Sequence, residues 1–386
     1  MMKINCEMKH VLLVPVFLFL TLAFGGCTMY TAYRDIVNMQ KEHEITNENG
    51  VPRLEYINAI PIIHLYGTHR EMGEQYGTIL KPQLNSMIVL GESLFSKRKL
   101  KRFYKMAEQT ELLMPVQVKA FLEGMAETSG VSYRKLLVLN LTSRVTCSVL
   151  AVWGEATVDG NMLMGRNADF HFQRVNKALG ILVVRHPSDG YATVASSFLG
   201  LAGTFTGINE KGVAYGNMLV YNGNDEEIDL TGFPIQLLMQ MGGEQFDNAR
   251  AMTDFLKNKQ HMIPNNVMCA DADEAFLSEL SPSGSAVREG QNGVLAATNY
   301  FISSGMFTKH VNEQRFANLM QYSQKHHGTF NLDKLQEAMY EARQLNENLQ
   351  CVLFEPAVMK MHISMNKVPA SEGPFTEFDL KLLFNE

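Results

Sequence analysis

Cysteine, tryptophan and excess positive charge are scarce in this sequence, and each scarcity excludes a class of protein. Five cysteines among 386 residues exclude a small disulfide-rich scaffold. A formal net charge of -6 argues against a dedicated nucleic-acid-binding protein, which usually carries a basic surface. A single tryptophan beside 22 phenylalanines and 24 methionines indicates a core of phenylalanine and methionine side chains. Because 46% of the residues are hydrophobic and only 19% are charged, the chain can form a sizeable core.

The common catalytic and cofactor-binding motifs are also missing. The sequence has no HExxH, CxxC, GxSxG or Walker motif, and no GxGxxG follows a predicted strand. The adjacent histidines His326 and His327 lie at a polar helix end, where neighbouring side chains do not face one ligand. No cysteine has the aromatic flanks of a papain-like nucleophile. We therefore predict neither a metal site nor a cofactor.

Residues 1–26 have the pattern of a secretory signal peptide of the lipoprotein type. Basic residues precede an apolar run over 11–24, which is shorter than the about 20 residues that a transmembrane helix needs. Two glycines and Cys27 follow and resemble a bacterial lipobox, in which the cysteine is lipidated. An ordinary signal peptide or an uncleaved anchor is the alternative. We expect an exported protein, anchored to the membrane of the bacterial envelope through lipid on Cys27 and facing the periplasm or the cell surface, with a polar tether over 27–59.

The remaining chain has helical patterns first and strand patterns later. Residues 61–65 predict a strand, and the apolar spacing over 69–84 predicts the start of a helical region. The basic run over 96–105 is either a solvated helix face or a surface for anionic lipid. After Cys147, strand-like stretches alternate with two pairs of helical segments. This order predicts an α+β fold of antiparallel sheets covered by helices.

One local arrangement should bring reactive side chains together. A strand that begins at Cys147 is followed by a turn at Asp159 and Gly160, and then by a strand that ends with Arg166 and Asp169. Because a hairpin returns the end of its second strand to the start of its first, a thiol, a guanidinium and a carboxylate should meet. The guanidinium would lower the pKa of the thiol. From the residues alone, a buried core cysteine beside a surface ion pair remains the alternative.

The segment CSVLAVWGEATVDGNMLMGRNADF, which begins at Cys147, resembles the mature N-terminus of an N-terminal-nucleophile (Ntn) hydrolase. It is most similar to the acyl-coenzyme A:6-aminopenicillanic acid acyltransferase-like family, and more distantly similar to choloylglycine hydrolases, penicillin V acylases and acid ceramidases. Five other stretches resemble segments of that family in the same order, so that the likeness spans roughly 60–384: Ile60–Leu80, Gly207–Met218, Leu295–Phe301, Asn312–Leu319 and Val352–Pro356. Thr146 and Tyr300 depart from the family, which usually has glycine and histidine at these positions.

The resemblance implies an Ntn-hydrolase αββα sandwich and two functional segments. A mainly helical pro-segment over 60–146 would precede a catalytic chain over 147–386. The chain would cut itself between Thr146 and Cys147, and the pro-segment would stay bound as an α chain. By this resemblance, Cys147 would be the nucleophile, Arg166 would lie beside its thiolate and Asp169 would hold the α-amine. Asn299 would donate to the oxyanion, and Arg315 would bind the carboxylate of Asp169 or the substrate.

The hypothesis that follows is a self-processing N-terminal-cysteine hydrolase or acyltransferase. It would cleave the linear, non-peptide amide of a small N-acyl substrate through an acyl-enzyme thioester. A bile-salt-like or N-acyl lipid amide is one form that the substrate could take. The alternative hypothesis is a non-catalytic lipoprotein with an Ntn-like fold that binds a ligand or an envelope partner.

Overall fold

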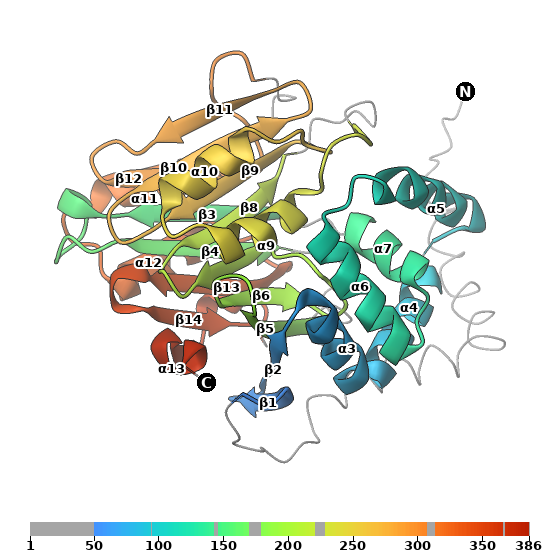
Figure 1. Ribbon diagram of the computed structural model, residues 1–386. Helices are drawn as coiled ribbons and strands as arrows, with labels where there is room; N and C mark the ends of the chain where they lie inside the picture. The colour runs from blue at the N-terminus through green and yellow to red at the C-terminus, as the bar shows by residue number, and fades with distance from the viewer. Residues whose placement is uncertain are drawn as a thin grey trace, which may run out of the picture.

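The computed structural model describes residues 50–93, 95–142, 146–169, 179–220, 228–306, 313–365 and 367–385. Within these ranges the chain forms two β-sheets and several helices (Figure 1). The predicted signal peptide and Cys27 lie outside the described residues. In the part of the chain that is described, no helix is both long enough and apolar enough to span a bilayer.

The first sheet has nine strands among the described residues, in the order β1-β2-β5-β6-β7-β8-β9-β10-β11. Neighbouring strands are antiparallel except β2 and β5, which are parallel. The strands are β1 (Arg53–Ile57), β2 (Ile60–Gly67), β5 (Gly180–Pro187), β6 (Thr193–Phe198), β7 (Thr206–Asn209), β8 (Ala214–Leu219), β9 (Asn265–Ala270), β10 (Ala275–Ser281) and β11 (Gly284–Glu289). Strand β1 lies inside the segment expected to be a tether, so the sheet begins upstream of residue 60.

The second sheet is antiparallel throughout and has six strands among the described residues, in the order β12-β3-β4-β13-β14-β15. These strands are β12 (Val294–Ala297), β3 (Thr146–Val152), β4 (Leu163–Asp169), β13 (Asn348–Glu355), β14 (Lys360–Ser364) and β15 (Thr376–Asp379). The α+β prediction is confirmed, because helices cover sheets that are antiparallel apart from one pair of strands.

Most helices pack on the outer faces of the two sheets, whereas the short helix at residues 380–384 packs against the core between the sheets. The helices are α3 (His69–Ile79), α4 (Lys81–Ser93), α5 (Lys97–Glu111), α6 (Val116–Ser129), α7 (Tyr133–Thr142), α9 (Ile235–Gln245), α10 (Ala249–Lys257), α11 (Gln314–Lys325), α12 (Leu332–Glu341) and α13 (Leu380–Phe384). One apolar cluster joins α3–α7 to the first sheet, and another joins α9 and α10 to it. A third cluster joins α11 and α12 to the second sheet. The largest cluster fills the space between the sheets and completes an αββα sandwich.

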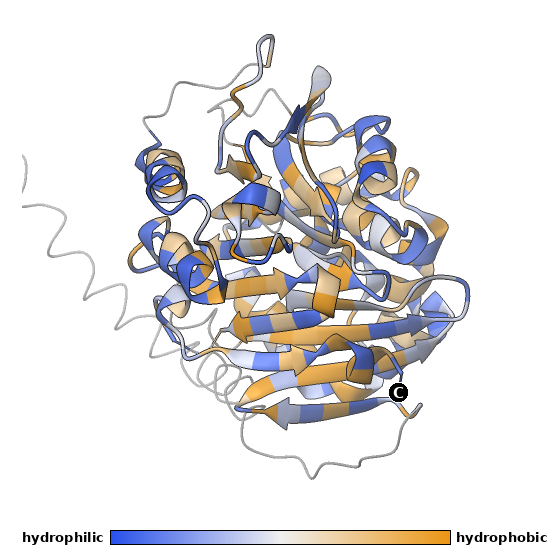
Figure 2. Ribbon diagram, turned by 90° about the vertical axis from the view of Figure 1, so that its left-hand side faces the viewer, coloured by the Kyte–Doolittle hydropathy of each residue, from blue (hydrophilic) through white to orange (hydrophobic). Residues whose placement is uncertain are grey.

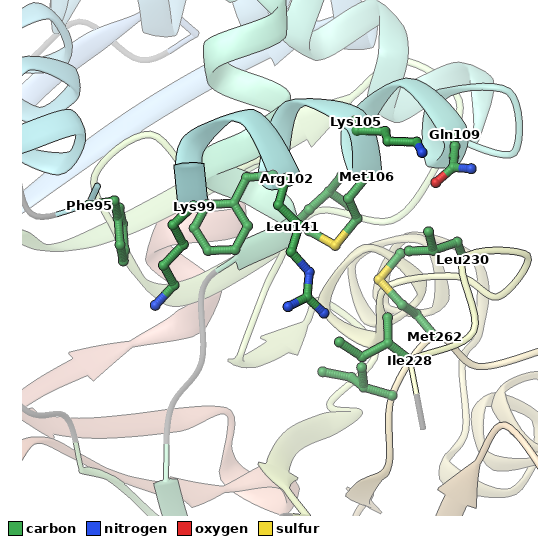
Figure 3. Close-up of a pocket in the computed structure, with 12 residues that line it drawn as sticks. Phe95, Lys99, Arg102, Lys105, Met106, Gln109, Leu141, Ile228, Leu230 and Met262 are labelled. Atoms are coloured by element: carbon green, nitrogen blue, oxygen red, sulfur yellow. The ribbon is translucent and has the colours of Figure 1, made fainter. Parts of the chain in front are cut away.

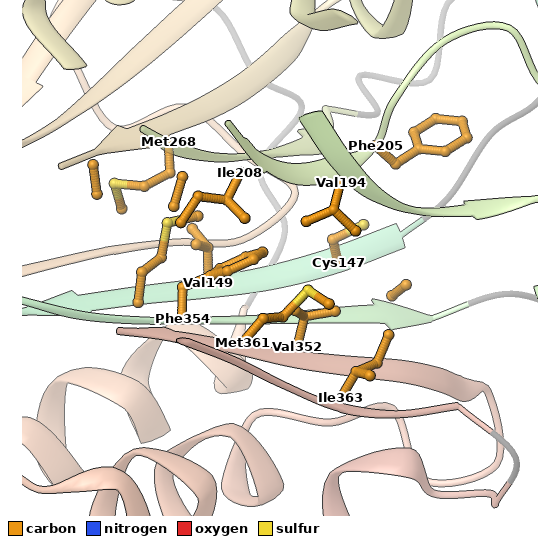
Figure 4. Close-up of a cluster of buried hydrophobic side chains, with 14 of the residues drawn as sticks. Cys147, Val149, Val194, Phe205, Ile208, Met268, Val352, Phe354, Met361 and Ile363 are labelled. Carbon is orange, nitrogen blue, oxygen red and sulfur yellow. The ribbon is translucent and has the colours of Figure 1, made fainter. Parts of the chain in front are cut away.

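Strand β3 shows how sequence alternation builds these layers. Cys147 and Val149 face the core between the sheets (Figure 4). Ala151 faces the same core, whereas Leu150 and Val152 face the helices. Because both faces are buried, the strand is almost continuously apolar. The same apolar content is visible along many strands of both sheets in Figure 2. Cys147 is thus placed at the inner face of the sandwich.

A capping box and two glycines shape the start of α3 and its packing. Thr68 caps the helix by accepting a hydrogen bond from the backbone N–H of Glu71, whose carboxylate accepts the N–H of Thr68 at 2.7 Å. Gly73 and Gly77 then let α3 approach α6. A Cβ on Gly73 would lie 2.1 Å from the carbonyl oxygen of Phe121. The glycines therefore set the packing distance between these helices.

We expect Gly73→Ala to lower the free energy of unfolding by about 1–3 kcal/mol, the usual cost of overpacking. The physical reason is the backbone carbonyl of Phe121, which cannot move as a flexible side chain would. Urea unfolding followed by circular dichroism measures the change. Gly91→Ala in α4 is the matched control, because among the described residues no atom beyond the helix's own backbone and the adjacent residues lies within 4 Å of its Cβ position. The control should be neutral or stabilising, and an equal loss in both variants would contradict the packing argument.

Candidate active site

The pairing of β3 with β4 brings Cys147 and Arg166 together. Cys147 lies opposite Ala168 and Val149 lies opposite Arg166, so Arg166 is the diagonal neighbour of Cys147 on the same face. The guanidinium Nη2 atom of Arg166 donates to Cys147 Sγ at 2.7 Å. The backbone N–H of Asp169 also donates to the sulfur. Both side chains are buried, with exposed fractions of 0% and 1%. The hairpin deduced from the sequence therefore encloses the thiol.

Arg315, just inside the start of α11, joins the other parts of the site. Its Nη1 atom donates to the carbonyl oxygen of Cys147 and to Asp169 Oδ2, both at 3.3 Å. Its Nη2 atom donates to Asn299 Oδ1 at 2.8 Å. The preceding Glu313 accepts from the same guanidinium and holds it in place. One side chain thus connects β3, β4 and the segment after β12.

Asn299 binds the backbone of Cys147. Its Oδ1 atom accepts the N–H of Cys147 at 3.0 Å, and its Nδ2 atom donates to the carbonyl oxygen of Leu219 at 2.6 Å. The sequence led us to expect Asp169 at the Cys147 nitrogen and Asn299 as an oxyanion donor. In the structure, Asn299 is the residue that binds this nitrogen, whereas the oxyanion role remains a prediction.

All five residues of the predicted catalytic set meet at one place, and Thr146 lies beside them. The Thr146 hydroxyl donates to the backbone carbonyl of Asp169 at 3.0 Å. Asn348, at the start of β13, donates to Asp169 Oδ1 at 3.0 Å. The carbonyl of Asn217 in β8 accepts from Arg166 at 2.9 Å. Neither asparagine was identified from the sequence, because both contacts join strands far apart in the chain.

Two further residues hold the turn that carries Asn299. Asn266 in β9 donates to the carbonyl oxygens of residues 298 and 300, at 2.9 and 2.8 Å, on both sides of Asn299. Glu279 in β10 is fully buried and accepts the backbone N–H groups of residues 302 and 303, both at 3.0 Å. Arg288 pairs with this carboxylate at 2.9 Å. Asn266 could have been found from the sequence, because a polar residue in the otherwise apolar stretch NVMCA indicates a buried hydrogen-bonding role.

Burial dominates the electrostatics of the site. It raises the pKa of the Cys147 thiol to about 11, although Arg166 acts in the opposite direction. Arg166 lowers the pKa of the thiol as expected from the sequence, but desolvation outweighs the guanidinium and the net shift is upward. Burial likewise raises the pKa of Asp169 to about 6, against the favourable charge of Arg315. With a pKa of about 11, the thiol is protonated at neutral pH in the folded chain.

The other two described cysteines make none of these contacts, although Cys351 in β13 pairs with Asn167 of β4, next to Arg166. Cys269 and Cys351 are free and buried, in the apolar clusters beneath α10 and α12 respectively. Tyr300 packs edge-on against Phe316, with ring centroids 5.6 Å apart. Among the residues that the structure describes, no three His, Cys, Asp or Glu side chains gather in a way that could hold a metal ion.

A family model with the description acyl-coenzyme A:6-aminopenicillanic acid acyl-transferase matches residues 156–366. The match contains Arg166, Asp169, Asn299 and Arg315, and begins downstream of Cys147. Two curated relatives come from Dictyostelium discoideum. Protein dcd1B is 29% identical over 43% of this chain and 39% of its own length. Protein dcd1A is 24% identical over 47% of this chain and 49% of its own length. The chain therefore spans less than half the length of either relative.

Three solved structures are similar at a lower level. An N-acylethanolamine-hydrolyzing acid amidase ortholog from Caenorhabditis elegans has a TM-score of 0.46 at 15% identity, over 54% of this chain and 93% of its own. A mutant conjugated bile acid hydrolase from Clostridium perfringens has a TM-score of 0.45 at 13% identity, over 61% and 93%. Penicillin V acylase from Agrobacterium tumefaciens has a TM-score of 0.43 at 13% identity, over 61% and 86%.

Asp169 should make the stability of the chain depend on pH. Its pKa is higher in the folded state, about 6, than the ordinary value of 3.8, so its contribution favours folding at low pH and is lost as pH rises through about 6. We expect Asp169→Asn, which cannot ionise, to be more stable relative to the parent at pH 8 than at pH 4. By linkage the difference is about 2–3 kcal/mol.

Urea unfolding at the two pH values, with Cys147→Ala in both chains, measures this difference. Asp254→Asn is the control, because its carboxylate is exposed and solvated in α10. The control should show no change between the two pH values. A relative stability of Asp169→Asn that is equal at both pH values, or greater at pH 4, would overturn the assignment of a raised pKa.

Proposed function

Because the chain belongs to the acyl-coenzyme A:6-aminopenicillanic acid acyl-transferase family, an Ntn-type family of amidases and acyltransferases, we propose that Cys147 is its self-processing nucleophile. The mature protein would cleave a linear, non-peptide carbon–nitrogen bond in a small N-acyl amide. One observation carries this proposal: the nitrogen, the carbonyl oxygen and the sulfur of Cys147 each have a hydrogen bond to a different side chain. Asn299 binds its nitrogen, Arg315 its carbonyl oxygen and Arg166 its sulfur. Such fixation is what a positioned nucleophile requires.

Self-cleavage would proceed by transfer of an acyl group from nitrogen to sulfur. Cys147 Sγ attacks the carbonyl carbon of Thr146, the peptide C–N bond breaks, and the thiol proton goes to the departing nitrogen. Water then hydrolyses the Thr146 thioester, which releases a carboxylate and regenerates the thiol. The product has a free α-amine on Cys147. Asn299 Oδ1, which already lies 3.0 Å from this nitrogen, would accept a hydrogen bond from the amine.

The new α-amine supplies the base that the buried thiol lacks. An α-amine has a reference pKa of about 7.7–8.0 and can accept the thiol proton near neutral pH. The thiolate attacks the substrate carbonyl, and collapse of the intermediate expels the amine with that proton and leaves an acyl thioester. Water resolves the thioester in a hydrolase, and a second amine resolves it in an acyltransferase. Arg166 beside the sulfur favours the thiolate, and Arg315 keeps Asp169 in place.

The cut pro-segment would remain bound as an α chain. Strand β2 pairs with β5 over Ile62 to Gly67, and the His69 ring in α3 lies 2.8 Å from the carboxylate of Glu244 in α9. These contacts join residues on opposite sides of the proposed cut. They support a two-chain enzyme rather than a shed propeptide.

A non-catalytic lipoprotein that binds a ligand or an envelope partner is the second candidate. Two observations favour it. Thr146 stands where the family usually has glycine. Burial also raises the thiol pKa to about 11, so the uncut chain lacks an activated nucleophile. The two candidates differ in whether the chain is cut.

Cys147→Ala should remain one chain and have no amidase activity, whereas the parent should split between Thr146 and Cys147. Cys147→Ser should lose most activity, because a hydroxyl is a poorer nucleophile than an amine-activated thiol at neutral pH. Denaturing electrophoresis, intact mass and a screen of N-acyl amides measure both properties. Cys269→Ala and Cys351→Ala are the controls and should split normally with reduced stability. An uncut parent that turns over amides would refute self-processing, and an uncut, inactive parent would favour the binding protein.

We further propose that the protein is exported and anchored by lipid on Cys27, so that it resides in the bacterial envelope. A single acyl chain binds membranes only marginally, so a multiply acylated cysteine is the expected anchor. Cys27→Ser should move the protein from the membrane fraction to the soluble fraction and leave amide turnover unchanged, because the site begins far downstream. Fractionation followed by immunoblotting measures this. A variant that stays with the membrane would contradict the lipidation of Cys27.

A further inference from the structure

Helix α5 presents a cationic face to solvent at the edge of the molecule (Figure 1). Its lysines and arginines are all exposed: Lys97, Arg98, Lys99, Lys101, Arg102 and Lys105. On the opposite side of the helix, Phe103, Met106 and Ala107 pack into the apolar cluster that joins α3–α7 to the first sheet. Because this packing fixes the rotation of the helix, the cations stay on the outside.

Arg98, Lys101 and Lys105 form a row along the exposed face of α5. They follow one another at intervals of three and four residues, which places them on one side of a helix. Seven residues further along the same side comes Leu112, the C-cap, whose backbone is still right-handed helical. A cavity of about 580 Å³ lies beside α5, and Lys99 is among the residues that line it (Figure 3). Arg98 and Lys101 take no part in that lining.

Two cations of this row have no acidic partner. Arg98 and Lys101 form no ion pair within the part of the chain that the structure describes. Glu108 is exposed on α5, but its carboxylate is already paired with Arg134 of α7. The other acidic residue of the helix, Glu111, is half-buried. The row therefore keeps an excess of positive charge that faces solvent, and it complements an anionic surface.

Apolar side chains continue the same surface beyond the end of α5. Leu112 is 84% exposed, and Val116 at the start of α6 is 78% exposed. Single exposed apolar residues are common on protein surfaces. Beside a row of cations, however, they give the pattern of a helix that lies in a membrane interface. A soluble polyanion would bind the cations but gain nothing from the leucine and the valine, so the pattern favours a bilayer.

The proposed lipid anchor would hold this surface near a membrane. Residues 27–49 separate Cys27 from the described structure, and a fully extended chain of that length spans at most about 80 Å. Because α5 would be tethered to the bilayer, it would meet the lipid at a high effective concentration. Weak contacts between α5 and the bilayer are enough under this condition.

We propose that the exposed face of α5 and the apolar turn after it dock on the surface of an anionic phospholipid bilayer. Arg98, Lys101 and Lys105 contact the phosphates of the headgroups, and Leu112 and Val116 enter the boundary between headgroups and acyl chains. This role goes beyond amide cleavage. It rests on the proposed envelope location only for the nearness of a bilayer, and it requires neither the cut nor activity.

Vesicle sedimentation tests docking by itself on the chain from residue 27 onward. Cys27→Ser removes the lipid, and Cys147→Ala makes the result independent of the proposed cut. The vesicles contain either phosphatidylcholine alone or an equal mixture with phosphatidylglycerol. We expect about 100-fold tighter binding to the mixed vesicles, weakened by added salt because the attraction is screened. Arg98→Gln together with Lys101→Gln should weaken this binding by about 25-fold, since each cation near an anionic membrane contributes about fivefold.

Lys257→Gln together with Lys325→Gln is the matched control, because it removes the same charge from exposed positions of α10 and α11. The control should leave vesicle binding unchanged. Equal binding to both kinds of vesicle would overturn the proposal. So would an equal loss of binding in the two double variants, because the attraction would then depend only on net charge.

Leu112→Ser distinguishes a bilayer from a soluble polyanion. It should weaken binding to mixed vesicles by about fivefold, because an apolar side chain no longer enters the interface, and leave binding to inorganic polyphosphate unchanged. Polyphosphate binding without vesicle binding, or a Leu112→Ser chain that binds vesicles as tightly as its parent, would refute docking on a bilayer. If vesicles bind as expected while the chain with Cys147 intact is uncut and inactive, the proposed function fails and the docking surface stands.

Discussion

The register between β3 and β4 is the constraint on which the candidate site depends. Side chains alternate along a strand, so a slip of one residue would turn Cys147 away from the core between the sheets and Arg166 away from Cys147. The buried faces on both sides prevent such a slip, because Val149 and Leu150 fill different apolar clusters. Packing far from the site thereby fixes the short distance between sulfur and guanidinium.

Buried charge is the second feature of the site, and hydrogen bonds offset much of its cost. Asp169 contacts Arg315 and Asn348, and Arg166 contacts a thiol and a backbone carbonyl. Glu279 and Arg288 form a second buried ion pair, next to the turn that carries Asn299. Buried ion pairs of this kind contribute little net stability but leave a large penalty when one partner is removed. Their value here is geometric, since they hold three separate segments around one cysteine.

The sequence predicted the parts of this arrangement that are local. The hairpin from Cys147 to Asp169 needs only a turn and strand alternation, so its geometry followed from the residues. Asn299 and Arg315 were identified only through family resemblance, because nothing in their own segments points to Cys147. Asn266 and Glu279 act on Asn299 from other strands and left no motif. Strand β1 lies in the segment predicted to be a polar tether, yet its Glu55 is buried and paired with His64 at 2.8 Å.

The parallel pairing of β2 with β5 has a consequence for the lifetime of the folded protein. A chain that folds and is then cut at Thr146 would keep β1 and β2 at the edge of a sheet whose other strands belong to a different polypeptide. Once separated, the two pieces would have to meet again in solution, and the uncovered edge of β5 would be open to pairing with other chains. Unfolding would then be irreversible in practice. The lifetime of such a molecule is set by the rate at which the strands of its first sheet separate. An equilibrium free energy of unfolding no longer describes its stability.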